Sequence, residues 1–171
     1  MRPRKSVVAA PRATLGQMRV LGIDYGQRRI GLALSDRTRL LARPWKTIAR
    51  QGSPARAADA LAAEILRLQA EDDGLDTVVL GLPRRLNGSP TDQTAEVEKL
   101  AAALRHRTPL PVVLQDERLS SREAESLLAR RIKDWRKRKP LLDAVAAAVI
   151  LQDYLDARVK PLGGAREDDL A

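Results

Sequence analysis

The sequence predicts an α/β fold in which a mixed five-stranded sheet is flanked by helices. Two apolar runs, at residues 19–24 and 30–35, flank a short loop that contains glycine, which is typical of a β-hairpin. Later in the chain, short apolar runs alternate with segments of helical periodicity, which favours parallel strands joined by helices. A hairpin followed by strand-helix units gives a mixed sheet with helices on both faces.

Each of the other elements has its own local signal. Three more strands are expected at residues 44–48, 76–82 and 111–117, the first with the weakest pattern. Ser53 and Pro54 indicate a helix start, and Ser120 with Glu123 forms a capping box for a helix that runs to about residue 130. The apolar stripes of the first two helices are Ala57, Leu61, Ile65 and Leu68, and then Val97, Leu100, Ala101 and Leu104.

The last helix is expected to begin at Pro140 and to be buried, because it is apolar on most sides. We expect one domain over residues 18–159, with a basic disordered leader at residues 1–17 and a disordered tail at residues 160–171. No apolar run reaches the roughly 18 residues that a membrane helix needs, so no membrane partner is expected.

The absence of cysteine and the net positive charge limit the classes of function that the chain can have. The chain has 171 residues and no cysteine, which excludes a disulfide framework, a thiolate metal site and a cysteine nucleophile, and suits a reducing cytoplasm. Its net charge of +9 indicates a polyanionic partner, because each cation that neutralises a phosphate releases a condensed counterion. The central domain stays basic when both ends are set aside, so nucleic acid is the expected partner.

Three carboxylates beside apolar segments form the candidate site. Asp24 ends the first apolar run, Glu117 ends the fifth strand, and Asp143 opens the last apolar segment. Burial and mutual repulsion both disfavour such charges, and a divalent metal offsets both effects directly. The carboxyl ends of parallel strands share one edge of the sheet, so Asp24 and Glu117 are expected to meet there. The sequence therefore predicts a metal-dependent nuclease.

Two of these positions have an alternative interpretation. Side chains alternate along a strand, so only one of Asp116 and Glu117 can face the site. An acid in the first turn of a helix, such as Asp143, is also stabilised by the helix dipole by a few tenths of a kcal/mol without any catalytic role.

Basic residues near these acids are candidates for phosphate contacts. The densest cluster, at residues 130–139, contains Trp135, which either stacks on an unpaired base or packs on the body of the protein. The alternative to phosphate binding is that this cluster is a solvated linker with no binding role. The candidate nucleic-acid-binding residues are Arg28, Arg29, Arg84, Arg85, Arg118, Lys133, Arg136, Lys137, Arg138 and Lys139.

Four ordered motifs resemble those of the YqgF/RuvX family, whose members are called Holliday-junction-resolvase-like proteins or pre-16S rRNA nucleases. They lie at residues 18–26 followed by 28–36, at residues 79–83 followed by Asn87-Gly88-Ser89, at residues 116–121 and at residues 143–155. The resemblance spans residues 18–158. It implies an RNase H-like fold and a cytoplasmic nuclease that helps to mature the 5′ end of 16S ribosomal RNA. The chain departs from the family pattern at Ala144, where a polar residue is usual.

The resemblance also implies site residues and cofactors. Carried over by position, the catalytic and metal-binding residues are Asp24, Glu117 and Asp143, which favours Glu117 over Asp116. Such a site would hold two Mg²⁺ or Mn²⁺ ions about 4 Å apart for in-line hydrolysis of a phosphodiester. The implied partners are an rRNA precursor and ribosomal particles, with the protein a monomer or a homodimer.

Three other functions compete with this one. A Holliday-junction resolvase would use the same chemistry on branched DNA, and a non-catalytic ribosome-assembly factor would need the basic surface but not three acids. An actin-like or sugar-kinase ATPase also begins with a similar hairpin. It requires a second lobe, for which this chain is too short.

Overall fold

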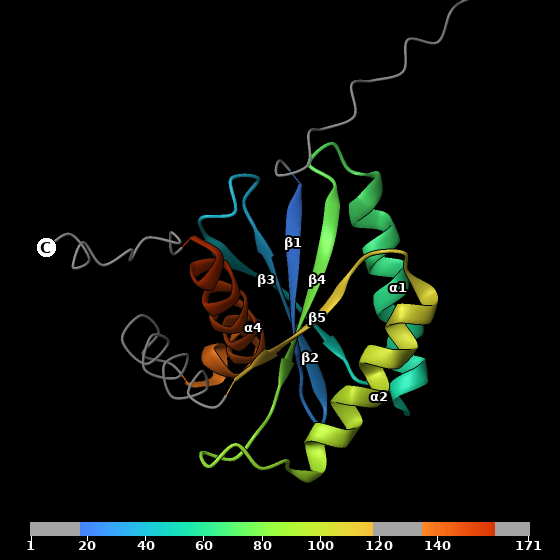
Figure 1. The fold of residues 1–171 in the computed structure, drawn as a ribbon, viewed down its shortest axis with the longest axis vertical. Coiled ribbons are helices and arrows are strands. Elements are labelled where there is room, and N and C mark those ends of the chain that lie inside the picture. The colour runs from blue at the N-terminus through green and yellow to red at the C-terminus, as the bar shows by residue number, and fades with distance from the viewer. Residues whose placement is uncertain (1–17, 118–134, 160–171) are drawn as a thin grey trace, which may run out of the picture.

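The computed structural model of the protein describes residues 18–117 and 135–159 (Figure 1). The leader, the tail and the helix expected at residues 120–130 lie outside these ranges. The strands are β1 (Arg19–Tyr25), β2 (Arg29–Ser35), β3 (Ala42–Ala49), β4 (Leu75–Leu82) and β5 (Val112–Asp116), and the described helices are α1 (Pro54–Ala70), α2 (Asp92–Arg107) and α4 (Trp135–Val159). All five expected strands are present.

The strands form one mixed sheet in the order β3-β2-β1-β4-β5. β1, β2 and β3 are antiparallel neighbours, whereas β4 runs parallel to β1 and β5 runs parallel to β4. This confirms the predicted hairpin and the predicted mixed five-stranded sheet. Because β1, β4 and β5 are parallel, their carboxyl ends lie at the same edge of the sheet.

Helices cover both faces of the sheet (Figure 1). α1 and α2 pack on one face over a core that includes Leu21, Ile23 and Leu80, and α4 packs on the other over Val20 and Val79. All eight residues of the two predicted helical stripes are buried. None of the described helices combines the length and the apolar character required to cross a membrane.

The first residues of α1 and α4 show which local sequence signals predicted a helix start correctly. The Ser53 side chain accepts a hydrogen bond from the Arg56 backbone N–H, and Pro54 is the first residue of α1, as expected. The predicted start of the last helix at Pro140 is wrong, because α4 already includes residue 135. Proline removes only one backbone hydrogen bond there, and the arginines and lysines before it have high helix propensity.

Glycines allow α4 to lie directly on the sheet. A Cβ added to Gly22 on β1 would lie 2.7 Å from the Cβ of Leu151, and one added to Gly31 on β2 would lie 1.8 Å from the carbonyl oxygen of Asp143. Neither position has room for a side chain. The beginning of the apolar part of α4 is therefore pressed against β1 and β2, and this contact places Asp143 over the sheet.

We expect Gly31→Ala to reduce stability by about 3 kcal/mol, because the added methyl group would meet a backbone atom that cannot turn away. For a domain of this size the melting temperature should fall by about 6–12 °C, measured by thermal denaturation. Arg43→Ala, at an exposed position of β3, is the control and should change little. A Gly31→Ala protein that melts like the wild type would contradict the close contact of α4 with β2.

Candidate active site

Asp24 and Asp143 are neighbours because the hairpin brings Asp24 beside Gly31. Asp24 pairs with Gly31 across β1 and β2. Cross-strand partners point to the same face of a sheet, so the Asp24 side chain projects toward α4. The backbone of Asp143 occupies the space above Gly31. Two acids that are far apart in the sequence thus lie side by side.

Glu117 reaches the same face from the end of β5. Val113 packs with the α4 core and Val112 with the opposite core, so alternation directs Glu117 toward α4 and Asp116 away from it. The Glu117 backbone N–H donates a hydrogen bond of 3.3 Å to the carbonyl of Leu82. The structure therefore places Glu117, and not the exposed Asp116, on the Asp24 side of the sheet.

Glu117 also lies close to β4. A Cβ added to Gly81 would lie 2.9 Å from Oε2 of Glu117, so the absence of a side chain at residue 81 leaves room for this carboxylate. Gly81 thus leaves space for Glu117, just as Gly31 leaves space for the backbone of Asp143. Each of the two acids lies over a glycine of the sheet.

The charged forms of Asp24 and Glu117 are disfavoured in the protein alone. Burial, reinforced by the charge of Asp143, raises the pKa of Asp24 from 3.8 to about 6. Burial, reinforced by the charges of Asp24 and Asp116, raises the pKa of Glu117 from 4.5 to about 8. Asp24 is thus coupled to both of the other acids, and a cation bound among them would relieve the repulsion.

Asp143 has a single cationic partner among the described residues. Nε of Arg29 lies 3.1 Å from Oδ2 of Asp143, yet this buried oxygen has no hydrogen-bond partner in the described part of the chain. The contact is close enough for charge attraction but is not aligned for a hydrogen bond. Arg29 was a candidate for phosphate binding, and here it lies against a candidate catalytic acid instead.

The donor set suits a hard divalent cation, although the three carboxylates do not form a closed cage. Within residues 18–117 and 135–159, no three histidine, cysteine, aspartate or glutamate side chains form a group that could hold a metal ion. The acids nevertheless offer carboxylate oxygens, the ligands that Mg²⁺ and Mn²⁺ prefer, and one Asp143 oxygen has no hydrogen bond to any described residue. Binding an ion would require these side chains to move closer together.

Residues distant in the sequence hold the turn that follows Asp24. Nε2 of Gln93 on α2 donates a hydrogen bond of 2.8 Å to the Tyr25 carbonyl, and Nη1 of Arg50 donates one of 3.2 Å to the Gly26 carbonyl. The Arg50 guanidinium also stacks 4.1 Å from the centre of the Tyr25 ring and forms an ion pair with Glu96. Sequence analysis missed Arg50 and Gln93, because nothing local marks a residue that supports a distant turn.

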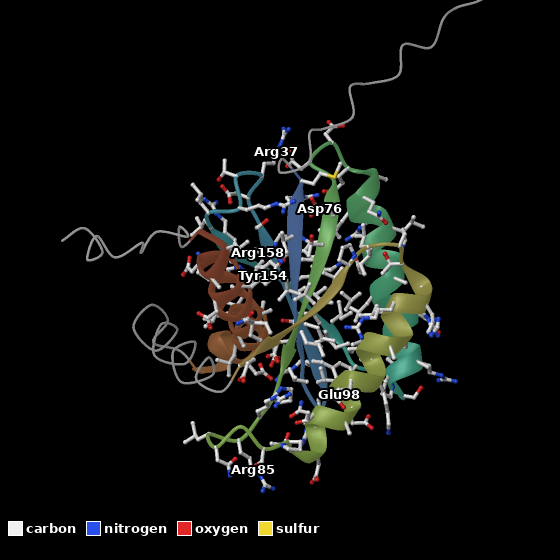
Figure 2. All side chains as sticks on the ribbon, in the orientation of Figure 1. Arg37, Asp76, Arg85, Glu98, Tyr154 and Arg158 are labelled. Atoms are coloured by element: carbon white, nitrogen blue, oxygen red, sulfur yellow. The ribbon has the colours of Figure 1, made fainter. Side chains whose placement is uncertain are left out.

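Three arginines that have no acidic partner among the described residues lie at the same end of the sheet as the acids. Arg28, Arg84 and Arg85 are exposed, and none of them pairs with an acid in the described part of the protein. At the opposite end, Arg19, Arg37 and Arg39 are each paired, with Glu71, Asp73 and Asp76 respectively. Figure 2 shows Arg37 and Asp76 at one end of the molecule and Arg85 at the other.

The remaining candidates for nucleic-acid binding are not placed. Arg118 and Lys133 lie outside the described residues. Four further candidates belong to the first residues of α4, whose side chains are not described: Arg136, Lys137, Arg138 and Lys139. The same holds for the side chain of Trp135.

Residues 18–157 match the family described as "RuvX: Holliday junction resolvase". The chain belongs to the RuvX family. A relative from Geobacillus kaustophilus (strain HTA426), named "Putative pre-16S rRNA nuclease", is 40% identical over 144 residues, covering 82% of this chain and 99% of that protein. A relative of the same name from Chloroflexus aggregans (strain MD-66 / DSM 9485) is 41% identical, covering 86% of this chain and 99% of that protein. The family resemblance of the four motifs is confirmed.

Among solved structures, RuvC from T. thermophilus in complex with a Holliday junction substrate is 20% identical to this RuvX chain, with a TM-score of 0.48. The match covers 84% of this chain and 96% of RuvC.

The structure explains what Ala144 does at the position where the RuvX pattern usually has a polar residue. Ala144 is 1% exposed and lies against Gly31, so it contributes packing and not a polar group.

Without metal, this RuvX protein should lose stability as the pH rises from about 4.5 to about 8. The folded state holds protons on Asp24 and Glu117 more tightly than the unfolded chain does, so deprotonation favours unfolding. The loss of folding stability is complete once the pH exceeds the pKa values that Asp24 and Glu117 have in the folded protein. Melting curves in EDTA at pH 5, 6, 7 and 8 measure the slope, which Glu117→Gln should flatten and the exposed control Asp72→Asn should not. An equally steep slope in Glu117→Gln would contradict the assignment.

Proposed function

We propose that the protein is a divalent-metal-dependent nuclease that hydrolyses phosphodiester bonds during 5′-end maturation of pre-16S rRNA in the cytoplasm. Membership of the RuvX family and the names of its relatives support a nuclease that acts on this RNA. The observation that carries the proposal is the position of Asp24, which lies beside Asp143 and is coupled to Glu117 at one edge of the sheet. A protein that only bound RNA would gain nothing from burying repelling acids.

Asp24, Glu117 and Asp143 would hold Mg²⁺ or Mn²⁺, with two ions as the proposed number. A bound ion of this kind activates water as a nucleophile and stabilises charge on the scissile phosphate and the leaving oxygen. The chain itself supplies the rigid support, because Asp24 is on a central strand and Asp143 is on a helix packed against that strand. Arg29 lies against Asp143 and holds a positive charge at the edge of the site.

The arginines near the acids would bind the substrate backbone. Arg28 lies in the turn of the β1-β2 hairpin, and Arg84 and Arg85 lie in the loop after β4. Because none of them pairs with an acid among the described residues, each is available to neutralise a phosphate. Binding should therefore weaken steeply as salt rises.

A branched-DNA resolvase is the second candidate, favoured by the family description "Holliday junction resolvase". The two functions share the acids and the ions and differ in substrate. Cleavage of structured RNA, single-stranded RNA and a four-way DNA junction, each with Mg²⁺ or Mn²⁺, separates them. Cleavage of none of these by the metal-loaded protein would instead favour a non-catalytic ribosome-assembly factor.

We expect Asp24→Asn to reduce cleavage by about 100-fold or more, because it removes a charge at the centre of the acid group. Nucleic-acid binding at moderate salt should be largely retained, since the arginines are unchanged. Cleavage rates and filter-binding affinities measure the two effects. Asp72→Asn, an exposed substitution between α1 and β4, is the matched control. Wild-type turnover by Asp24→Asn would remove this residue from the mechanism.

We also expect Mn²⁺ to raise the melting temperature, because the ion binds the folded site and neutralises its acids. At about 100 times the dissociation constant the gain is about 2.7 kcal/mol, or about 5–10 °C for a domain of this size. Thermal denaturation of the wild type and of Asp24→Asn over a Mn²⁺ titration measures it. An equal rise in both proteins would indicate binding elsewhere.

A further inference from the structure

The Asn87-Gly88-Ser89 motif builds a loop that is held by its own hydrogen bonds. Oδ1 of Asn87 accepts hydrogen bonds from the backbone N–H and the hydroxyl of Ser89, at 3.0 and 2.7 Å. Gly88 has φ of +85°, a conformation that favours glycine. An isolated bridge between Arg84 and Pro90 closes the base of the loop. The motif therefore stabilises the conformation of this loop, which ends at Pro90, just before α2.

Further bonds fix the arginines of the same loop. The backbone N–H of Arg85 donates to the Ser89 carbonyl at 2.9 Å, and the backbone N–H of Gly88 donates to the Arg85 carbonyl at 2.8 Å. Nη1 of Arg84 donates to the Gly88 carbonyl at 3.2 Å. The loop is thus pre-organised, so little conformational entropy would be lost when it binds a partner.

The loop presents an unusual tip. Leu86 is 73% exposed, the highest exposure of any large hydrophobic side chain in the described part of the chain. One exposed leucine is ordinary on a protein surface and carries no argument by itself. Here, however, it follows two exposed arginines on a loop that leaves the carboxyl end of β4, beside the candidate active site. Figure 2 shows Arg85 in this loop, projecting away from the body of the protein.

We propose that residues 84–90 form an RNA-binding finger, in which Arg84 and Arg85 contact backbone phosphates and Leu86 packs on an exposed base at the junction of a stem with a single strand. This inference rests on the proposed nuclease function and specifies the form of RNA that the site receives. The finger starts at the end of β4, the strand between those that lead to Asp24 and Glu117.

The chemistry of the tip favours a stem junction over a continuous duplex. Base faces are hidden by stacking within a duplex, and the deep major groove of A-form RNA does not admit side chains. At the end of a stem a base face is exposed. In DNA complexes, apolar side chains such as leucine insert between base steps and pack on the base faces that they unstack. The two arginines match the negative charge of the flanking phosphates.

The test measures binding and base stacking separately from cleavage. Full-length protein carrying Asp24→Asn is titrated onto an RNA stem with a single-stranded 5′ extension and 2-aminopurine at the junction. Leu86→Ala should weaken binding about five- to tenfold and abolish the fluorescence change at the junction, while leaving the salt dependence unaltered. Leu86→Phe should retain both signals. Because Leu86 is exposed, its variants should melt like the parent protein.

Arg85→Gln should instead reduce the slope of log affinity against log salt by about 1, because one phosphate contact is lost. Leu66→Ala is the matched control, since Leu66 is 70% exposed on α1, and it should change neither signal.

Different outcomes would overturn the RNA-binding finger, the proposed nuclease function, or both. If the parent binds and Leu86→Ala binds equally well, the finger is overturned and the nuclease function stands. If the effect of Leu86 is the same on a continuous RNA duplex, or appears only with a four-way DNA junction, the assignment to an RNA stem junction is overturned. If the parent binds neither RNA, both proposals are overturned. Leu86-dependent binding with no cleavage by the wild type overturns the nuclease function alone.

Discussion

The arrangement of the candidate site depends on the close packing of α4 against β1 and β2. Gly22 and Gly31 remove the side chains that would hold the helix away, and the Asp143 backbone occupies the space above Gly31. Asp24 is paired with this same glycine, so one contact both completes the second core and brings two acids together. Close packing usually matters for stability. Here it also determines which acidic residues lie next to each other in the candidate site.

The acids themselves oppose folding. Raised pKa values at Asp24 and Glu117 mean that their ionised forms are less stable in the folded protein than in the unfolded chain. Natural proteins retain such strained groups where activity needs them, and the rest of the fold compensates. The compensation here includes two separate cores and the contacts of Arg50 and Gln93 with the turn after Asp24.

Local patterns predicted most of the fold, and tertiary contacts account for what they missed. Strand periodicity, the Ser53 cap and the helical stripes are encoded within a few residues, and each is present in the structure. Strand alternation alone could not decide between Asp116 and Glu117, and only the family resemblance favoured Glu117. The choice depends on which core receives the neighbouring valines. The contact of Arg29 with Asp143 likewise has no local signature. The early start of α4 differs, because the helix propensity of the basic residues before Pro140 outweighs the start signal of the proline.

The place of α4 in the chain has a consequence for biosynthesis. The hairpin that carries Asp24 leaves the ribosome early, whereas the helix that carries Asp143 is the last described element. The three antiparallel strands can pair while translation continues. Among the described residues it is α4 that lies over Gly31, so this part of the sheet stays uncovered by them until the helix has docked. Asp24 and Asp143 therefore come together only when α4 has docked.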